Sequence, residues 1–231
     1  MFGGDHPELG RTMTRASAVA RALEHRRVGS EHVLLALTTG TFGSLLARHG
    51  ATETAIRDAV CRAAPAGASA AADREDLAVL GVDLDRLLDG ETAVLDRRTA
   101  REPLFPLGAA KAHRRCASAK PPIGLDTQAV YAASLRLALA RRERDHRVEH
   151  LALTLLTLDP GAAWTLTAAD VDRAALLTAM VMAFPPPRRN PVLRADRRIG
   201  LRARHRDIVR RYQRTTGRSV TAADAFGALI A

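Results

Sequence analysis

The chain has 231 residues, of which 47% are hydrophobic and 26% charged, a balance typical of a folded globular protein. Aromatic residues make up only 3%, so helices are favoured over a β-sandwich or β-barrel. No segment approaches the roughly 20 consecutive apolar residues of a membrane span, and the first residues lack the layout of a signal peptide. Two cysteines exclude a disulfide framework. We therefore expect a cytoplasmic, all-α protein without a membrane partner.

The net charge of +10 is concentrated at one end of the chain. Twelve of the 35 basic residues, but only three of the 25 acidic ones, lie within residues 188–231. The residues before this segment are therefore nearly neutral, and the basic character belongs to a tail. A basic segment of this kind indicates either an anion-binding surface or a solvated helix face.

Helical patterns fill the first quarter of the chain. Apolar residues recur at helical spacing over residues 5–23, with Asp5 as the expected N-cap. A second helix is expected after the turn at Gly29, with Ser30 as its cap, and a short third helix follows it. Residues 52–64 predict a fourth helix. A unit of this size is marginally stable unless it packs on a partner surface.

Small residues and prolines interrupt the middle of the chain. Residues 63–72 are interpreted as a linker of small residues, and residues 76–88 as a short helical pair that is broken at Gly81. Residues 96–122 are rich in Arg, Pro and Ala and show little periodicity, which indicates an exposed connection. We therefore expect a linker region over residues 65–122 between two helical halves.

The helical pattern resumes in the second half of the chain. A first long helix is expected from Asp126, followed by a strongly apolar helix over residues 149–158 and a last helix over about 170–184. Three consecutive prolines, beginning with Pro185, end the neutral body of the chain, because proline cannot continue a helix.

Two segments of the chain share one pattern. The segments LEHRRVGSEHVLLAL (23–37) and RERDHRVEHLALTLL (142–156) each have a basic, turn-forming lead, then Glu-His, then an apolar helix. A longer amphipathic helix precedes each of them. We infer the duplication of a helical unit about a pseudo-twofold axis, with repeats over 1–64 and 123–184 and an Arg-rich helical tail over 185–231.

The first segment resembles the signature of the Clp N-terminal (Clp repeat) domain family, which includes the N-domain of ClpC and stand-alone actinobacterial members. The signature is approximately His-x-x-Ile/Val-Gly-Thr/Ser-Glu-His, followed by an apolar helix. The chain matches it at His25, Gly29, Ser30 and His32. The resemblance implies an all-α fold of two pseudo-symmetric four-helix repeats.

The second copy of the signature is degenerate. Glu149 and His150 are kept, but Arg147 and Val148 stand where the family has glycine and a hydroxyl residue. The resemblance is strong in the first half of the chain and weak in the second. It covers residues 1–184 and does not explain the Arg-rich tail.

Members of the family bind adaptor proteins, substrates or peptides, so the resemblance implies a docking role. It places Glu31, Glu149 and Phe2 at a ligand-binding surface, where the glutamates contact the guanidinium of a phosphorylated arginine. A carboxylate at a helix start can accept both donors of a guanidinium. The alternative is that the glutamates only stabilise helix starts, that His32 and His150 hydrogen-bond within their repeats, and that Phe2 closes the bundle.

Catalytic motifs are missing or incomplete in the sequence. No Gly-x-x-x-x-Gly-Lys-Ser/Thr loop occurs, so the chain lacks the phosphate cradle of an ATP-driven motor, and no Gly-x-Ser-x-Gly elbow occurs. His146, Glu149 and His150 match the His-x-x-Glu-His pattern of inverted zinc peptidases, but no Glu follows as a third ligand. We therefore expect no enzyme activity, no metal and no cofactor.

The tail segment 197–214 combines an apolar stripe with many arginines. The stripe consists of Leu201, His205, Ile208, Val209 and Tyr212. The basic face consists of Arg202, Arg204, Arg206, Arg210, Arg211 and Arg214. We expect the stripe to pack on the body and the arginines to form a basic face that can contact nucleic acid. Base stacking is not supported, because the segment has a single aromatic residue.

The sequence thus favours a non-catalytic protein- or peptide-binding module that acts as adaptor, regulator or decoy in Clp-dependent proteolysis. Its expected partners are Clp protease components, adaptors and client proteins or peptides. The alternative is a nucleic-acid-binding protein that uses the Arg-rich tail. The first interpretation depends on the signature at residues 25–37 together with the missing ATPase, and the second predicts a steeply salt-dependent affinity for DNA or RNA.

Overall fold

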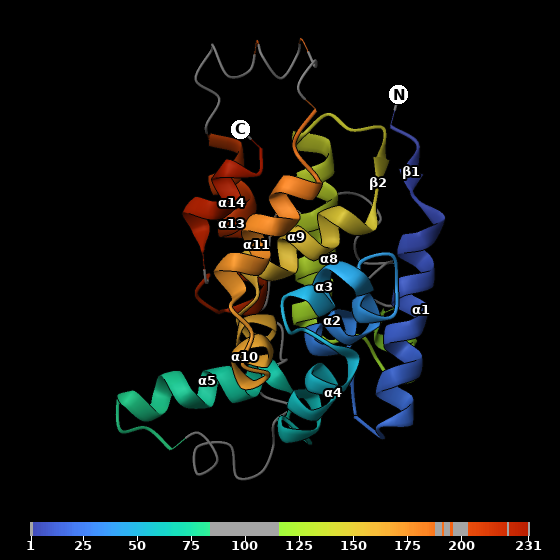
Figure 1. Cartoon of the computed structure of the whole chain (residues 1–231). Coiled ribbons are helices and arrows are strands. Elements are labelled where there is room, and N and C mark those ends of the chain that lie inside the picture. Colours follow the sequence, from blue (N-terminus) through green and yellow to red (C-terminus); the bar gives the residue numbers. More distant parts are fainter. Residues whose placement is uncertain are drawn as a thin grey trace.

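The structure is a computed structural model, and it describes the chain in segments: residues 2–83, 116–187, 203–220 and 222–230, with positions 191 and 195. In these segments the protein is mostly helical (Figure 1), which confirms the expectation of an all-α fold. The described strands, β1 (Gly4–Asp5) and β2 (Asp145–His146), have two residues each. Within the same segments, no helix combines the length and the apolar character needed to cross a membrane.

Four helices form the first part of the fold. They are α1 (Pro7–Ala22), α2 (Ser30–Thr38), α3 (Gly43–Arg48) and α4 (Glu53–Arg62). The sequence predicted these elements to within about two residues, because each has apolar residues at helical spacing and a clear start signal. The Thr52 hydroxyl, for example, caps α4 by accepting the amide N–H of Ala55.

Two of the expected helix caps are wrong. Asp5 does not cap α1, because it lies in β1, and the cap is His6, whose ring accepts the amide N–H of Glu8. Ser30 is the first residue of α2 rather than its cap, a position held by Gly29. The Ser30 hydroxyl donates instead to a distant carboxylate, a use that the local sequence cannot reveal.

The prediction of a linker over residues 63–72 is also wrong for residues 68–72. Residues from Ala68 onward form α5 (Ala68–Val79), whose first five residues are buried. Alanine is the strongest helix former, and its small side chain lets α5 lie close against another helix, so a run that looks like a linker becomes a packed helix. Helix α5 ends before Gly81, as expected, and residues 84–115 lie outside the described part.

Four further helices form the second part of the fold. They are α8 (Leu125–Ala140), α9 (Val148–Leu158), α10 (Pro160–Ala168) and α11 (Arg173–Ala183). The sequence reasoning predicted three of them and missed α10. Its start signal is present in the sequence, because Asp159 caps the helix and Pro160 occupies its first position.

The extended segments that precede the helices pair across the molecule. Strand β1, before α1, pairs in parallel with β2, before α9, with Asp5 opposite His146. In the same way, Val28 before α2 forms a parallel bridge with Ile123 before α8. Residues far apart in the sequence therefore hold the starts of four helices together.

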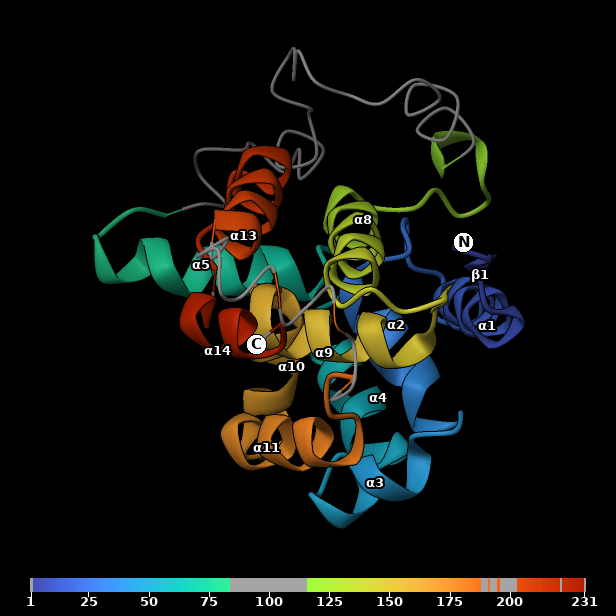
Figure 2. The same cartoon turned by 90° about the horizontal axis from the view of Figure 1, so that it is seen from above.

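Helix α9 lies at the centre of the described fold (Figure 2). It contacts α1, α2, α8, α10, α11 and α14 (Ala223–Ala228), and all of its residues are buried. A helix that is apolar on all sides must be covered on all sides. The apolar residues of α9 lie on every side of the helix, and the surrounding helices cover all of them.

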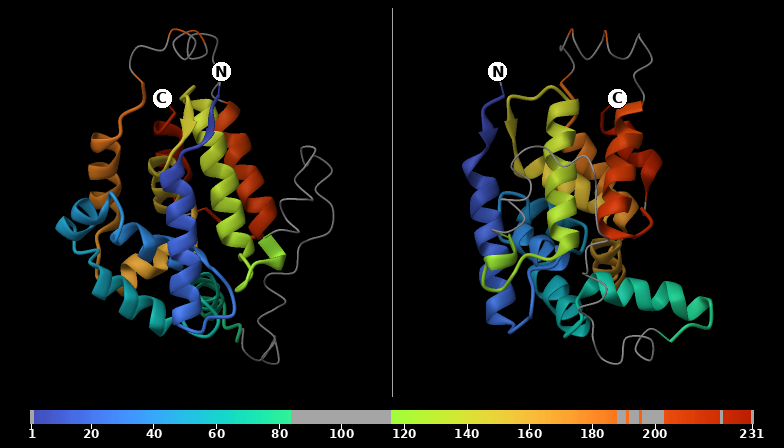
Figure 3. Two further views of the ribbon diagram at one scale, coloured as in Figure 1. Left: turned by 90° about the vertical axis from the view of Figure 1, so that its right-hand side faces the viewer. Right: turned by 180° about the vertical axis from the view of Figure 1, so that it is seen from behind.

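The Arg-rich tail is part of the packed structure. Helix α13 (Ala203–Thr216) lies beside α8 (Figure 3), with Ile208, Val209 and Tyr212 buried as their spacing predicts. The segment is also tied down by polar contacts, since the Arg218 guanidinium donates to both carboxylate oxygens of Asp73 at 2.7–2.9 Å. Residues 203–220 and 222–230 are therefore anchored to the body.

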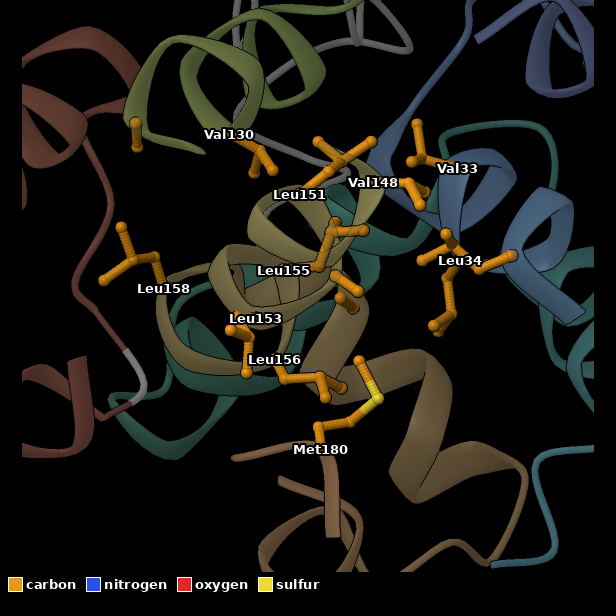
Figure 4. Packing of buried hydrophobic residues seen from close by; sticks show 14 of the residues in the cluster. Val33, Leu34, Val130, Val148, Leu151, Leu153, Leu155, Leu156, Leu158 and Met180 are labelled. Carbon is orange, nitrogen blue, oxygen red and sulfur yellow. The ribbon is translucent and has the colours of Figure 1, made fainter. Parts of the chain in front are cut away.

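One apolar cluster runs through both halves and the tail. Figure 4 shows the side chains of α9 radiating from the helix, with Leu151 toward Val130 of α8 and Leu156 toward Met180 of α11. Val148 lies beside Val33 at the start of α2 in the same view. The two halves therefore share a single core, and neither buries its apolar surface alone.

Replacing Tyr212 with Phe tests the anchoring of the tail. The Tyr212 hydroxyl donates to Asp159 Oδ2 at 2.7 Å, and both side chains are buried. Because Tyr212→Phe leaves a buried acceptor unsatisfied, we expect a loss of about 1–3 kcal/mol in the free energy of unfolding, measured with urea. Tyr131→Phe is the control, since its hydroxyl bonds to the exposed Asp5 and water can replace it. Equal losses in both variants would contradict this anchoring.

Candidate functional site

Helices α2 and α9 begin with the same side-chain cap. The amide N–H of Gly29 donates to His32 Nδ1 at 3.0 Å, and the amide N–H of Arg147 donates to His150 Nδ1 at 3.0 Å. Both rings are buried. Since Nδ1 accepts a hydrogen bond in each neutral ring, Nε2 carries the proton. Each signature histidine therefore satisfies a backbone donor that the buried helix start would otherwise leave without an acceptor.

The protonated nitrogen of each capping histidine also has a partner. His32 Nε2 lies 2.8 Å from His25 Nδ1, and His150 Nε2 lies 3.2 Å from Glu143 Oε1. Burial and the neighbouring His32 ring lower the pKa of His25, which favours the neutral, accepting ring. Burial is the largest influence on Glu143 and raises its pKa, but the contact with His150 and the charges of Arg141 and Arg147 together outweigh it, so the pKa is lowered overall. Both histidines therefore hydrogen-bond within their own half of the chain. This is the arrangement that the sequence predicted as the alternative to a role in ligand binding.

This hydrogen bonding does not fit a metal ion. His25, Glu31 and His32 do gather ligand atoms within 4.8 Å of one another. However, a metal on His32 Nε2 requires a proton on Nδ1, and Nδ1 already accepts the Gly29 amide. The zinc-peptidase pattern of His146, Glu149 and His150 does not fit a metal ion either. Both ring nitrogens of His146 are already in contact with protein side chains, Asp5 and Ser134.

The Glu31 carboxylate is enclosed by the protein. The residue is 2% exposed, and its Oε2 atom has no hydrogen-bond partner within the described segments. A Cβ atom on Gly29 would overlap with this carboxylate, and one on Gly67, whose φ is +89°, would lie 3.2 Å from Oε1. Glycine at both positions therefore makes room for the carboxylate. The expected position at a helix start is correct, but a ligand cannot reach Glu31 in this arrangement.

The Glu149 carboxylate is in contact with a guanidinium of the chain itself. Arg147 donates to Glu149 Oε1 at 2.5 Å, while Oε2 has no hydrogen-bond partner in the described segments. Glu149 is 9% exposed, and the Arg147 side chain is half exposed. Arg147 stands where the family signature has glycine, and its guanidinium thus binds Glu149. The sequence predicted that Glu149 would bind the guanidinium of a ligand.

The remaining predicted residues are Phe2 and the arginines of the tail. Phe2 is half-buried and is not part of the packed apolar cluster. The basic residues Arg206, Arg210 and Arg214 are exposed on α13, and Arg211 is half-buried. Arg202 and the side chain of Arg204 lie outside the described part of the structure.

A Ser–His–Asp chain, which sequence reasoning missed, joins α8 to both strands. Ser134 Oγ lies 2.8 Å from His146 Nε2, and His146 Nδ1 lies 2.8 Å from Asp5 Oδ1. The distances match those of a hydrolase triad, but Ser134 and His146 are fully buried, and Ser134 also bonds to a carbonyl of its own helix. Burial lowers the pKa of His146, which the Asp5 carboxylate opposes. A substrate cannot reach the buried serine in this arrangement, and the chain of contacts fixes β1 to β2.

Two buried carboxylates join the halves and the tail. Asp159 accepts hydrogen bonds from the Ser30 hydroxyl at 2.6 Å and the Tyr212 hydroxyl at 2.7 Å. Asp126 accepts from the Ser30 amide at 3.2 Å and the Ser69 hydroxyl at 2.9 Å. Burial, reinforced by the charge of Asp126, raises the pKa of Asp159 to about 6. These donors come from α2, α5 and α13, so sequence spacing alone could not have found the cluster.

A scan against protein-family models and a search of curated proteins found no match to this chain. The resemblance to the Clp repeat family therefore rests on the signature residues of the sequence alone.

Replacing Asp159 with Asn tests the buried carboxylates through pH. The folded protein holds the Asp159 proton more tightly than the unfolded chain, whose aspartates titrate near 3.8. This group therefore contributes stability below pH 3.8 that is lost as the pH rises through about 6. Relative to wild type, Asp159→Asn should gain about 2–2.5 kcal/mol between pH 4 and pH 8 in urea unfolding. The exposed Asp170→Asn is the control, and a constant difference between wild type and Asp159→Asn would contradict the shift.

Replacing Gly29 with Ala tests the enclosure of Glu31. The added methyl group should push the carboxylate into solvent, because the φ of −86° at this position suits any residue and the obstructing atoms end a flexible side chain. We expect a loss of no more than about 1 kcal/mol in urea unfolding. We also expect Glu31→Gln to alter stability in wild type but not in Gly29→Ala. Gly43→Ala is the control: its methyl group meets the rigid Thr38 carbonyl and should cost more.

Proposed function

We propose that this chain is a non-catalytic protein- or peptide-binding module related to the Clp N-terminal domain. In this proposal it is built from two pseudo-symmetric four-helix repeats and acts as adaptor, regulator or decoy in Clp-dependent proteolysis. The main observation in its support is the histidine cap that the two halves share. His32 and His150 each accept the amide N–H at the helix start and contact a residue that follows the preceding helix.

The order and geometry of the helices support two repeats. Helices α1 to α4 correspond to α8 to α11, and α1 and α8 each have 16 residues. The turns after these two helices contain a left-handed residue at the same place, Glu24 with φ 55° and Arg142 with φ 58°. Asp5, before the first helix of one half, pairs with His146, before the second helix of the other half. Ile123 and Val28 form the equivalent pair with the two halves interchanged, as a pseudo-twofold axis requires.

The Glu149 contact supports a cationic ligand. Arg147 shows that a guanidinium fits this carboxylate, and its half-exposed side chain can be displaced by a ligand more easily than a buried one. In the proposal, the guanidinium of a client arginine or phosphoarginine competes with Arg147 for Glu149. Glu31, which is closed, plays no part in this competition.

Replacing Arg147 with Gly, the residue of the family signature, tests this proposal. Removing the internal competitor should increase the affinity for a fluorescent phosphoarginine peptide about three- to tenfold, because a partly exposed ion pair is worth about 1 kcal/mol. Binding is measured by fluorescence anisotropy, with the unphosphorylated peptide alongside. Glu149→Gln should abolish the binding in both backgrounds. Arg144→Gly, at an exposed arginine nearby, is the control for lost positive charge.

The Clp connection is tested with the same variants. Immobilised wild-type protein should capture a Clp unfoldase subunit, an adaptor or an arginine-phosphorylated client from cell extract, and Glu149→Gln should capture less client. Deletion of residues 188–231 is not a suitable variant, because it removes the buried Tyr212 and Phe226 from the core. A folded protein that captures none of these partners, and no effect of Arg147→Gly on peptide binding, would overturn the proposal.

A further inference from the structure

The outer face of α13 carries a row of unpaired arginines. Arg206, Arg210 and Arg214 are exposed, and none of them has a side-chain partner in the described part of the chain. They are spaced four residues apart, so they follow one another along one helix face at about 6 Å per step. Asp207 is the acidic residue on the exposed side of this helix, and the half-buried Arg211 adds a fourth cation.

The opposite face of α13 fixes this arginine row in place. Ile208, Val209 and Tyr212 are buried against the body, and the Tyr212 hydroxyl donates to the buried Asp159. The Arg218 guanidinium, beyond the end of the helix, holds Asp73 of α5. The backbone that carries the row is therefore ordered before any ligand arrives, which reduces the entropic cost of binding.

The composition of the exposed face limits the classes of ligand that it suits. Large apolar side chains are not exposed on α13 in its described positions. Protein interfaces depend on buried aromatic or apolar anchors, and single-stranded nucleic acids depend on base stacking against aromatic rings, so both are disfavoured. A duplex backbone needs only cations that reach successive phosphates.

We propose that the arginine row Arg206–Arg210–Arg214 binds the phosphate backbone of duplex DNA without reading its sequence. This site lies on a different helix from Glu149, so it is independent of the peptide-binding function proposed above. Guanidinium groups suit phosphate oxygens because they can donate two parallel hydrogen bonds.

The test is a salt titration of the full chain with a fluorescein-labelled 20-base-pair duplex of mixed sequence. Three phosphate contacts predict that the logarithm of the affinity falls with the logarithm of salt concentration with a slope of about −2.7. The affinity should therefore drop roughly 40-fold between 50 and 200 mM salt. The triple variant R206Q/R210Q/R214Q should lose this affinity and this slope, with an unchanged urea-unfolding curve.

The matched control is R26Q/R48Q/R144Q, which removes the same charge from exposed arginines elsewhere on the body. This control should keep the affinity and the slope of wild type. Equal loss in both triple variants would show a general effect of net charge and overturn the proposal. An acidic polyglutamate peptide is titrated in parallel. If it binds through the same arginines more tightly than the duplex does, the face belongs to an acidic protein partner, and the proposal is also overturned.

Discussion

The burial of two helix starts is the constraint on which the rest of the structure depends. Helices α2 and α9 lie at the centre, so their first amides cannot be satisfied by water. His32 and His150 solve this problem in the same way: each ring accepts one amide N–H at Nδ1 and donates a hydrogen bond from Nε2 to a residue that follows the preceding helix. The turn, the cap and the central helix are therefore fixed together in each half.

A second set of buried polar contacts joins the parts that the caps leave separate. The Ser30 hydroxyl at the start of α2 reaches Asp159 at the start of α10, and Tyr212 of α13 reaches the same carboxylate. Asp126 adds the start of α8 and Ser69 of α5. Because buried carboxylates are stable only with several donors, this junction requires all of these elements at once. The basic tail is one of them.

The same burial governs what the signature glutamates can do. Glycine at position 29 leaves room for the enclosed Glu31 carboxylate, whereas Arg147 at the corresponding place pairs with Glu149. The residue before the helix therefore distinguishes a carboxylate enclosed by the protein from one paired with a guanidinium of the chain. On α13, by contrast, the apolar face packs against the body, and the arginines of the opposite face are exposed to solvent.

The sequence by itself determined the helical class, the bounds of most helices, the strongly apolar character of α9 and the apolar stripe of α13, since each follows from local spacing. It also indicated that both signature histidines bond within their own halves. Only the tertiary structure decided that residues 68–72 form a packed helix, that Asp5 pairs with His146, and that Asp126 and Asp159 share one buried junction. Those contacts join residues that are distant in the chain, and their energies depend on burial, which no local pattern records.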